Sequence, residues 1–331
     1  MAFSKSGYAK NFSKNTTHTT YNIPIIALFQ ENIVSFTRLF FVASLFLFVQ
    51  FFFRMKKLIL LLAMSTLLFV GTSANANSNK SAPRKIAVQM YSLNRFTLEE
   101  AIEKLKPLGI DAIECYRGQR LSKKFPKAKV GPDLNAEERA YMKKLISDAG
   151  MKMVSFGVIS VRKYSGEEIE PIFKFVQEMG GERILTESAV YFLPMWDKMA
   201  EKYGIQVLLH HHATTDYPYW DTDFFKKHAS GFKNIKYNPD PGHWARSGID
   251  PVKALKEVAG YVAGIHFKDQ REFGNIKNQP APFGKGVLDI KGMLTELDKQ
   301  GFNGYYVIEY EDNWMNNIPE IKECAEYLRK N

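Results

Sequence analysis

Histidine is concentrated in one part of this 331-residue chain. Six of its seven histidines lie between His210 and His266, and five of those six occur where short apolar runs end. Such runs are typical of buried β-strands. His210 and His212 share one face of a strand because strand side chains alternate, so both imidazoles can reach one metal ion or one substrate.

Carboxylates end four of the apolar runs: Glu114, Glu187, Asp240 and Glu309. His243 lies three residues after Asp240, and Lys268 shares a strand face with His266. Because buried lysine is uncommon unless it is paired, this position favours a functional role for Lys268. Imidazoles and carboxylates without thiolates are the ligands of divalent ions such as Mn, Zn, Co or Mg.

These residues converge only if the strands that carry them end at one place. Eight short, β-branched runs are separated by helical patterns, and they span residues 85–92, 111–116, 151–158, 183–188, 206–211, 235–240, 262–267 and 305–310. Helix starts are indicated by the capping-box pairs Thr97/Glu100 and Asn135/Glu138 and by Asp250 before Pro251. Eight strand–helix units in about 250 residues predict one (β/α)8, or TIM, barrel rather than a doubly wound sheet. Its site is expected at the C-terminal ends of the strands.

The beginning of the chain has a different composition. Residues 1–54 carry 11 of the 25 Phe and are expected to be an upstream extension that is absent from the mature protein. Residues 55–76 then show a Met-Lys-Lys start, an apolar run and an Ala-Asn-Ala exit, the order of a secretory signal peptide. We therefore expect an exported protein, periplasmic or secreted, whose barrel is residues 77–331 and which has no stable membrane association after cleavage.

Charge and cysteine content limit the classes of partner. Seven Lys/Arg and one Asp/Glu precede Asn77, so the formal charge of +10 falls to +4 in the expected mature chain. This argues against a nucleic-acid partner, and the expected ligand is a small-molecule sugar or keto-sugar. Two cysteines are too few for a disulfide framework. The sequence leaves open whether the chain forms a homo-oligomer.

The sequence resembles the xylose isomerase-like superfamily of sugar and sugar phosphate isomerases and epimerases, and most closely its exported members. The resemblance extends from Lys85 to the C-terminus. It rests on the stretches Val88–Ser92, Ile113–Glu114, His210–His212, Asp240–Trp244, Gly248–Pro251, His266–Asp269, Phe283–Gly286 and Ile308–Glu311.

The resemblance implies one divalent metal at the barrel mouth. Asp240, His266 and Glu309 are then the expected ligands, and His243 is expected to contact substrate oxygens. Four residues are expected to bind substrate: Gln89, Glu114, His243 and Trp244. The epimerases of the superfamily have a glutamate at the position of His210, so either His210 or Glu187 is expected to complete the metal shell. This departure argues against a mechanism with two opposed glutamates.

The chemistry expected from these residues is proton abstraction next to a carbonyl. A divalent ion that binds a ketone oxygen and a neighbouring hydroxyl acidifies the carbon and stabilises the enediolate. Glu309 is the first candidate for the base, Glu187 or His212 for a group on the far side, and Lys268 for a donor to the oxyanion. The expected activity is a sugar isomerase or epimerase. A 3-keto-glycoside lyase or hydrolase is the first alternative, and a saccharide-binding barrel without turnover is the second.

Overall fold

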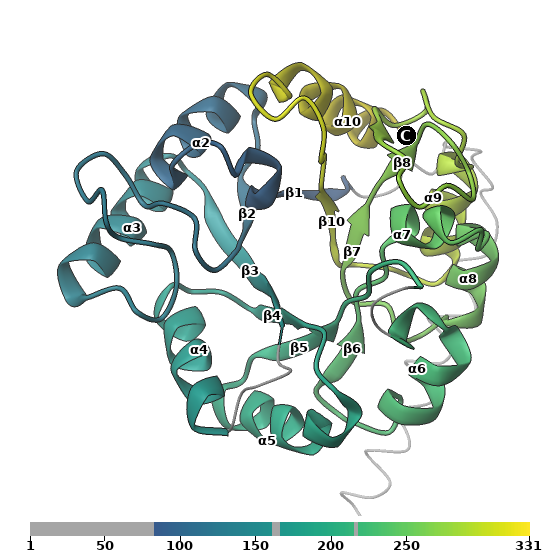
Figure 1. Ribbon diagram of the computed structural model, residues 1–331, viewed down its shortest axis with the longest axis horizontal. Helices are drawn as coiled ribbons and strands as arrows, with labels where there is room; N and C mark the ends of the chain where they lie inside the picture. The colour runs from purple at the N-terminus through teal and green to yellow at the C-terminus, as the bar shows by residue number, and fades with distance from the viewer. Residues whose placement is uncertain (1–82, 161–165, 215–217) are drawn as a thin grey trace, which may run out of the picture. The chain divides into compact units, whose positions relative to one another are not determined.

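A computed structural model describes residues 83–160, 166–214 and 218–331 (Figure 1). The expected extension and signal peptide lie outside the described residues, so export stays a prediction. Eight parallel strands form one sheet in the order β6-β5-β4-β3-β2-β1-β10-β7. These strands are β1 Lys85–Gln89, β2 Ala112–Cys115, β3 Lys152–Ile159, β4 Arg183–Thr186, β5 Gln206–Leu209, β6 Ile235–Tyr237, β7 Ile265–Phe267 and β10 Tyr305–Ile308.

Backbone hydrogen bonds bring the two ends of this sheet together. Ala263 N donates to Tyr237 O at 3.0 Å, and His266 N donates to Pro239 O at 3.1 Å. The sheet therefore closes into the predicted (β/α)8 barrel, with its helices outside the ring of strands (Figure 1). All eight predicted strands are confirmed.

Three helices begin where the sequence predicts, after Thr97, Asn135 and Asp250. The α-helices of the described residues are α2 Leu98–Leu105, α3 Ala136–Asp148, α4 Gly166–Glu178, α5 Leu193–Tyr203, α6 Thr222–Ala229, α7 Pro241–Arg246, α8 Pro251–Glu257, α9 Ile290–Lys299 and α10 Ile318–Lys330. Both predicted capping boxes are present, at Thr97 and at Asn135. Asp250 caps α8 through the backbone N–H groups of Val252 and Lys253. A satisfied first turn fixes where each helix starts and therefore how long each strand-to-helix loop is.

The inner face of the barrel changes from apolar to polar along three neighbouring strands, β1, β2 and β10. Ala87, Ala112 and Val307 belong to a small buried cluster inside the barrel. Two residues further along the same strands lie Gln89, Glu114 and Glu309. Because side chains alternate, each pair shares the inner face, so apolar packing at one end continues into polar groups at the C-terminal end.

A short antiparallel hairpin follows β7. Its strands are β8, Asp269–Gln270, and β9, Pro280–Ala281. The Asp269 carboxylate accepts hydrogen bonds from the backbone N–H groups of Gly284, Gly286, Leu288 and Gln270, at 2.8 to 3.1 Å. One buried side chain thus fixes the path from β7 to α9.

Two further findings concern the described residues. Cys115 and Cys324 are buried and free. Among the described helices, none combines the length and the apolarity that crossing a membrane requires.

Replacing Asp269 by Ala removes four charge-assisted hydrogen bonds together. We expect the Asp269→Ala change to lower the free energy of unfolding by about 3 kcal/mol, measured by urea denaturation. Asp289→Ala is the matched control, because Asp289 accepts one bond, from Gly292 N at the start of α9, and its loss is expected to cost about 1 kcal/mol. Equal losses for the two variants would contradict this role of Asp269.

Candidate functional site

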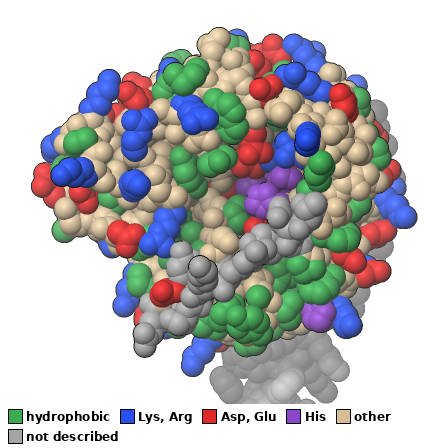
Figure 2. Space-filling view, viewed as in Figure 1, with side chains coloured by type: hydrophobic (Ala, Val, Ile, Leu, Met, Phe, Trp, Pro, Cys, Tyr) green, Lys and Arg blue, Asp and Glu red, His purple; other side chains and the backbone are tan. Residues whose placement is uncertain are grey.

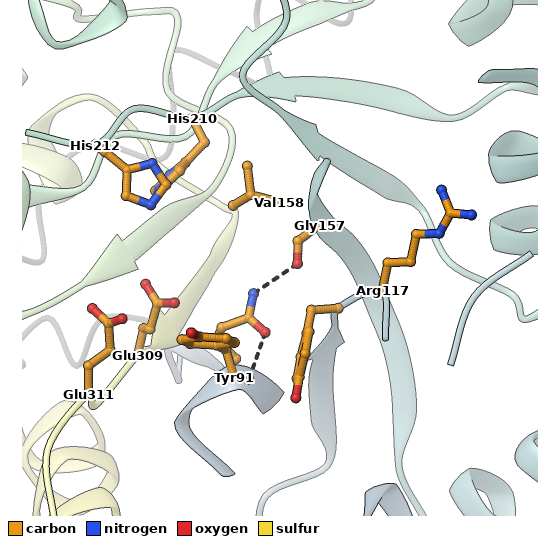
Figure 3. Close-up of a pocket in the computed structure, with 10 residues that line it drawn as sticks. Tyr91, Arg117, Gly157, Val158, His210, His212, Glu309 and Glu311 are labelled. Atoms are coloured by element: carbon orange, nitrogen blue, oxygen red, sulfur yellow. Dashed lines mark hydrogen bonds between the residues drawn. The ribbon is translucent and has the colours of Figure 1, made fainter. Parts of the chain in front are cut away.

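A cavity of about 290 Å³ lies at the C-terminal ends of the strands. It is lined by Gln89, Tyr91, Tyr116, Arg117, Gly157, Val158, His210, His212, Glu309 and Glu311. His210 and His212 lie on one side and the two glutamates on another (Figure 3). Histidines are visible in a hollow of the same face (Figure 2). The cavity is therefore placed where a barrel enzyme binds its substrate.

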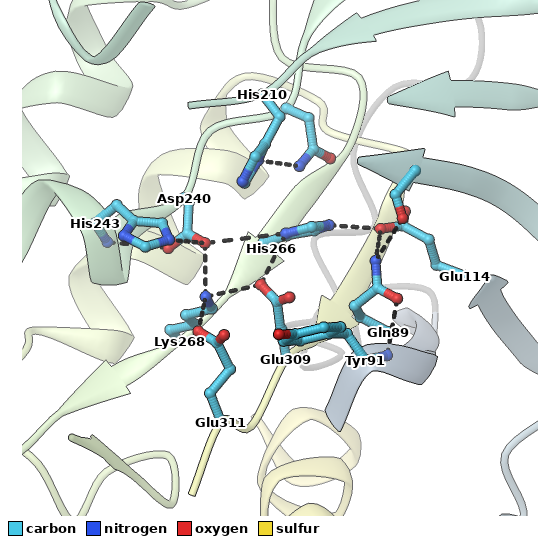
Figure 4. A network of polar contacts seen from close by, with 12 residues as sticks. Gln89, Tyr91, Glu114, His210, Asp240, His243, His266, Lys268, Glu309 and Glu311 are labelled. Carbon is cyan, nitrogen blue, oxygen red and sulfur yellow. Dashed lines mark hydrogen bonds and ion pairs between the residues drawn. The ribbon is translucent and has the colours of Figure 1, made fainter. Parts of the chain in front are cut away.

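His266 is held from behind by a chain of buried side chains (Figure 4). Its Nε2 lies 2.6 Å from Glu114 Oε1, which also accepts a hydrogen bond from Gln89 Nε2 at 2.6 Å. Gln89 Nε2 also donates to Gly157 O, and Ser155 Oγ donates to the other oxygen of Glu114. An N–H donated to Glu114 leaves Nδ1 of His266 pointing toward Asp240 and Glu309, 3.9 and 3.0 Å away.

Lys268 binds three carboxylates. Its Nζ lies 2.9 Å from Asp240 Oδ2, 2.7 Å from Glu309 Oε2 and 3.0 Å from Glu311 Oε2. Burial alone would lower the pKa of Lys268, but the three carboxylates outweigh burial and raise it. Burial would raise the pKa of Glu309, whereas Lys268 and His266 lower it well below its usual range. Lys268 is therefore an ammonium ion at neutral pH and Glu309 a carboxylate.

His266 is also drawn toward its charged form. Burial opposes a positive charge on the ring, but Glu114 and Glu309 overcome it and raise the pKa of His266 to about 10. The opposite holds for His210, where burial and the nearby histidines lower the pKa well below its ordinary value. His210 therefore carries the neutral imidazole that metal coordination requires, whereas His266 must release a proton to act as a ligand.

The donor set at this point fits a divalent cation. Within the described residues, Asp240 Oδ2 and His266 Nδ1 are buried without a hydrogen-bond partner of good geometry. His210 offers a third ligand atom, and the three ligand atoms lie within 4.8 Å of one another. Glu309 Oε2, beside His266 Nδ1, is placed to be a fourth. Two imidazoles and two carboxylates are typical ligands of Zn, Mn or Co.

His212 belongs to a second pair on the cavity wall. Its Nδ1 contacts a carboxylate oxygen of Glu187, which is buried, whereas the imidazole of His212 is partly exposed. Burial disfavours the charged ring, but Glu187 outweighs burial and raises the pKa of His212. A carboxylate behind an imidazole fixes the tautomer and leaves the outer nitrogen free to exchange a proton.

His211 and His243 have other surroundings. His211 Nδ1 lies 3.1 Å from His212 O, and its Nε2 accepts a hydrogen bond from Asp240 N at 3.0 Å. This fixes a neutral ring that supports the Asp240 backbone. The backbone N–H of His243, in the first turn of α7, donates to Asp240 Oδ1 at 3.0 Å. The ring centroid of His243 lies 4.7 Å from that of His212.

The structure brings most of the predicted site residues together at the barrel mouth, where some line the cavity and others lie behind its lining. Trp244 is fully buried against His211 and donates its Nε1–H to Trp220 O, so it does not line the cavity. Gln89 lines the cavity, whereas Glu114 lies behind His266. No role was predicted from the sequence for three residues that line the cavity, Tyr91, Tyr116 and Glu311. Tyr91 and Glu311 lie in stretches that carry the family resemblance, and Tyr116 had only its position just after a strand as a signal.

Comparisons with known proteins agree with the fold. Residues 102–331 match the family described as xylose isomerase-like TIM barrel. The chain is 23% identical over 278 residues to inosose dehydratase of Clostridium beijerinckii, which covers 71% of this chain and 87% of that protein. A solved structure of an uncharacterised protein from Parabacteroides distasonis has a TM-score of 0.62 at 30% identity, covering 75% of this chain and 99% of that one. A sugar phosphate isomerase/epimerase of the same organism has a TM-score of 0.57 at 17% identity, covering 78% and 98%, and this likeness concerns the fold alone.

The support of His266 by Glu114 leads to a test of metal affinity. Removing the charge behind a metal-binding imidazole weakens the imidazole as a ligand, so Glu114→Gln is expected to lower Zn²⁺ affinity about tenfold. Competition with a chromophoric chelator measures the affinity. Glu178→Gln is the control, since Glu178 pairs with Arg139 on the outer surface. An unchanged affinity in a folded Glu114→Gln protein would contradict the assignment.

Proposed function

The chain belongs to the xylose isomerase-like TIM barrel family, and we propose that it is a sugar-modifying enzyme that removes a proton next to the carbonyl of a keto-sugar or a related polyol ketone. The observation that carries the proposal is the His212–Glu187 pair, which faces the cavity beside the His210–Asp240–His266 cluster. The His212–Glu187 pair supplies a base, and the cluster supplies a place for a metal ion that polarises the carbonyl. Each contributes one imidazole to the lining of the same cavity, His212 from the pair and His210 from the cluster.

A divalent metal would be held by His210, Asp240, His266 and Glu309. When bound, such an ion supplies positive charge that stabilises the negative charge developing on a carbonyl oxygen. The protein's own part is to hold the four ligands in place. Glu114 fixes the ring of His266, and Lys268 holds Asp240 and Glu309 by contacts of 2.9 and 2.7 Å.

Two side chains therefore take roles different from those expected from the sequence. Lys268 Nζ already contacts three carboxylates, so we assign it to positioning the ligands rather than to donating to the substrate. Glu309 is a weak base because Lys268 and His266 lower its pKa. His212 is the better base, and Glu187 orients it.

A single base of this kind supports elimination as the first candidate reaction. His212 takes the proton from the carbon next to the carbonyl, and the electrons of that C–H bond form a carbon–carbon double bond. The bond to the oxygen on the next carbon then breaks, and His212 returns its proton to the departing oxygen. The product is an unsaturated ketone plus water or an alcohol. The relation to inosose dehydratase supports this reaction class.

Isomerase or epimerase activity is the second candidate. It is favoured by Glu309, whose carboxylate lies on the side of the cavity away from His212 (Figure 3). Return of the proton from that side, or to the neighbouring carbon, would give an epimer or an isomer. A barrel that only binds saccharide does not need the His212–Glu187 pair. Export of the protein is proposed from the sequence of residues 55–76 alone.

One experiment separates these outcomes. Purified protein with Mn²⁺ is incubated in heavy water with a 3-keto-glucoside, and the products are followed by NMR. Release of the aglycone with an unsaturated ketone is the expected result. Deuterium next to the carbonyl of an intact glycoside would instead favour the isomerase or epimerase. If neither change occurs, the result favours a barrel that only binds saccharide.

Substitution of the base tests its role separately. His212→Gln is expected to lower kcat about 10³-fold, because a positioned general base contributes that order of rate, while metal affinity stays within a few-fold. Glu187→Gln is expected to lower kcat less, about tenfold, with KM nearly unchanged, since it acts through His212. The matched control is His228→Gln, in α6 away from the cavity lining. An activity of His212→Gln equal to that of the control would overturn the assignment.

A further inference from the structure

Three aromatic rings lie in contact at the edge of the cavity. Tyr91 packs edge to face with Tyr116, with ring centroids 5.2 Å apart, and with Trp314, 5.9 Å away. Tyr91 is 41% exposed, which is high for a large aromatic side chain. We refer to Tyr91, Tyr116 and Trp314 as the aromatic rim.

The aromatic rim continues from the cavity to the outer surface. Tyr91 and Tyr116 line the cavity, whereas Trp314 is absent from its lining and lies beyond Tyr91. The backbone N–H of Tyr91 donates to Gln89 Oε1 at 3.1 Å, which ties the rim to the side chain that also supports Glu114. The rim is therefore placed at a fixed position relative to the reacting end of the site.

The charges of the lining disfavour a phosphate group at this end. Glu309 and Glu311 contribute carboxylates, and their partner Lys268 is buried between them. Arg117 is the one cation among the described residues that line the cavity, and it already pairs with Asp133 at 2.7 Å. A dianion entering here would meet two carboxylates and one engaged guanidinium.

The size of the cavity also limits the ligand. About 290 Å³ is at the low end of volumes that hold small molecules, so it suits one sugar ring. A second ring joined to the first through a glycosidic oxygen would extend past Tyr91 toward Trp314. Aromatic faces bind the apolar faces of such rings without requiring charge.

We propose that the aromatic rim is a second subsite that binds a neutral ring attached to the reacting sugar, so that the substrate is an unphosphorylated glycoside. This inference rests on the proposed function and deepens it, because it names the substrate class of the same site. The group that leaves in the elimination is then the ring held by the rim.

Binding of unreactive glycosides tests the subsite without turnover. Isothermal titration of the metal-loaded protein is carried out with methyl β-glucoside, phenyl β-glucoside and glucose 6-phosphate. Phenyl β-glucoside is expected to bind about tenfold more tightly than methyl β-glucoside, since stacking of one ring contributes about that factor. Trp314→Ala and Tyr91→Ala are expected to abolish this difference, and Tyr91→Phe to retain it.

Tyr191→Ala is the matched control, because Tyr191 is 70% exposed and does not line the cavity. Equal affinities for the two glucosides, or tightest binding of glucose 6-phosphate, would overturn the subsite. A phenyl preference in a protein that eliminates nothing from keto-glycosides would keep the subsite and contradict the proposed reaction. Elimination without a preference for phenyl β-glucoside would support the proposed reaction and contradict the subsite.

Discussion

Four carboxylates gather at the mouth of this barrel, two of them fully buried and two partly exposed, and the rest of the site depends on how their charge is balanced. Glu114, Asp240, Glu309 and Glu311 surround Lys268 and His266. Burying a charge is costly unless it is paired, so Lys268 must lie among the carboxylates and His266 between two of them. Even with both residues protonated, two positive charges face four negative ones. This surplus of carboxylates, beside the His210–Asp240–His266 cluster, favours a bound cation.

The barrel produces this arrangement through strand alternation. One inner face carries Ala87 and Ala112 at the bottom and Gln89 and Glu114 two residues later. The apolar layer contributes packing, whereas the polar layer contributes ligands and their supports. A shift of one residue in a strand would exchange its inner and outer faces. The register that forms the core therefore also decides which side chains point into the barrel mouth.

The fold could be predicted because its signals are local. Alternating strands, capping boxes such as Thr97/Glu100 and the proline after Asp250 each depend on a few neighbouring residues, and the structure confirms them. Strand ends also indicated where Asp240, His266 and Glu309 would meet. Contacts between side chains of different strands and loops at the barrel mouth could not be predicted from the sequence. Glu187 contacts His212, and Tyr91 contacts Trp314 from the far end of the chain. These contacts depend on loop geometry that no local pattern encodes. Trp244 was also not predictable, because the sequence around an aromatic residue next to a histidine does not tell whether its ring is buried or faces a ligand.

We propose that His210, Asp240, His266 and Glu309 hold one divalent cation beside a separate base, His212. Anomalous X-ray diffraction from crystals soaked in Mn²⁺ tests it most directly. One strong peak is expected, bounded by His210, Asp240, His266 and Glu309, with His212 still in contact with Glu187. A peak coordinated by Glu187 and His212, or the lack of any peak at the barrel mouth, would contradict it.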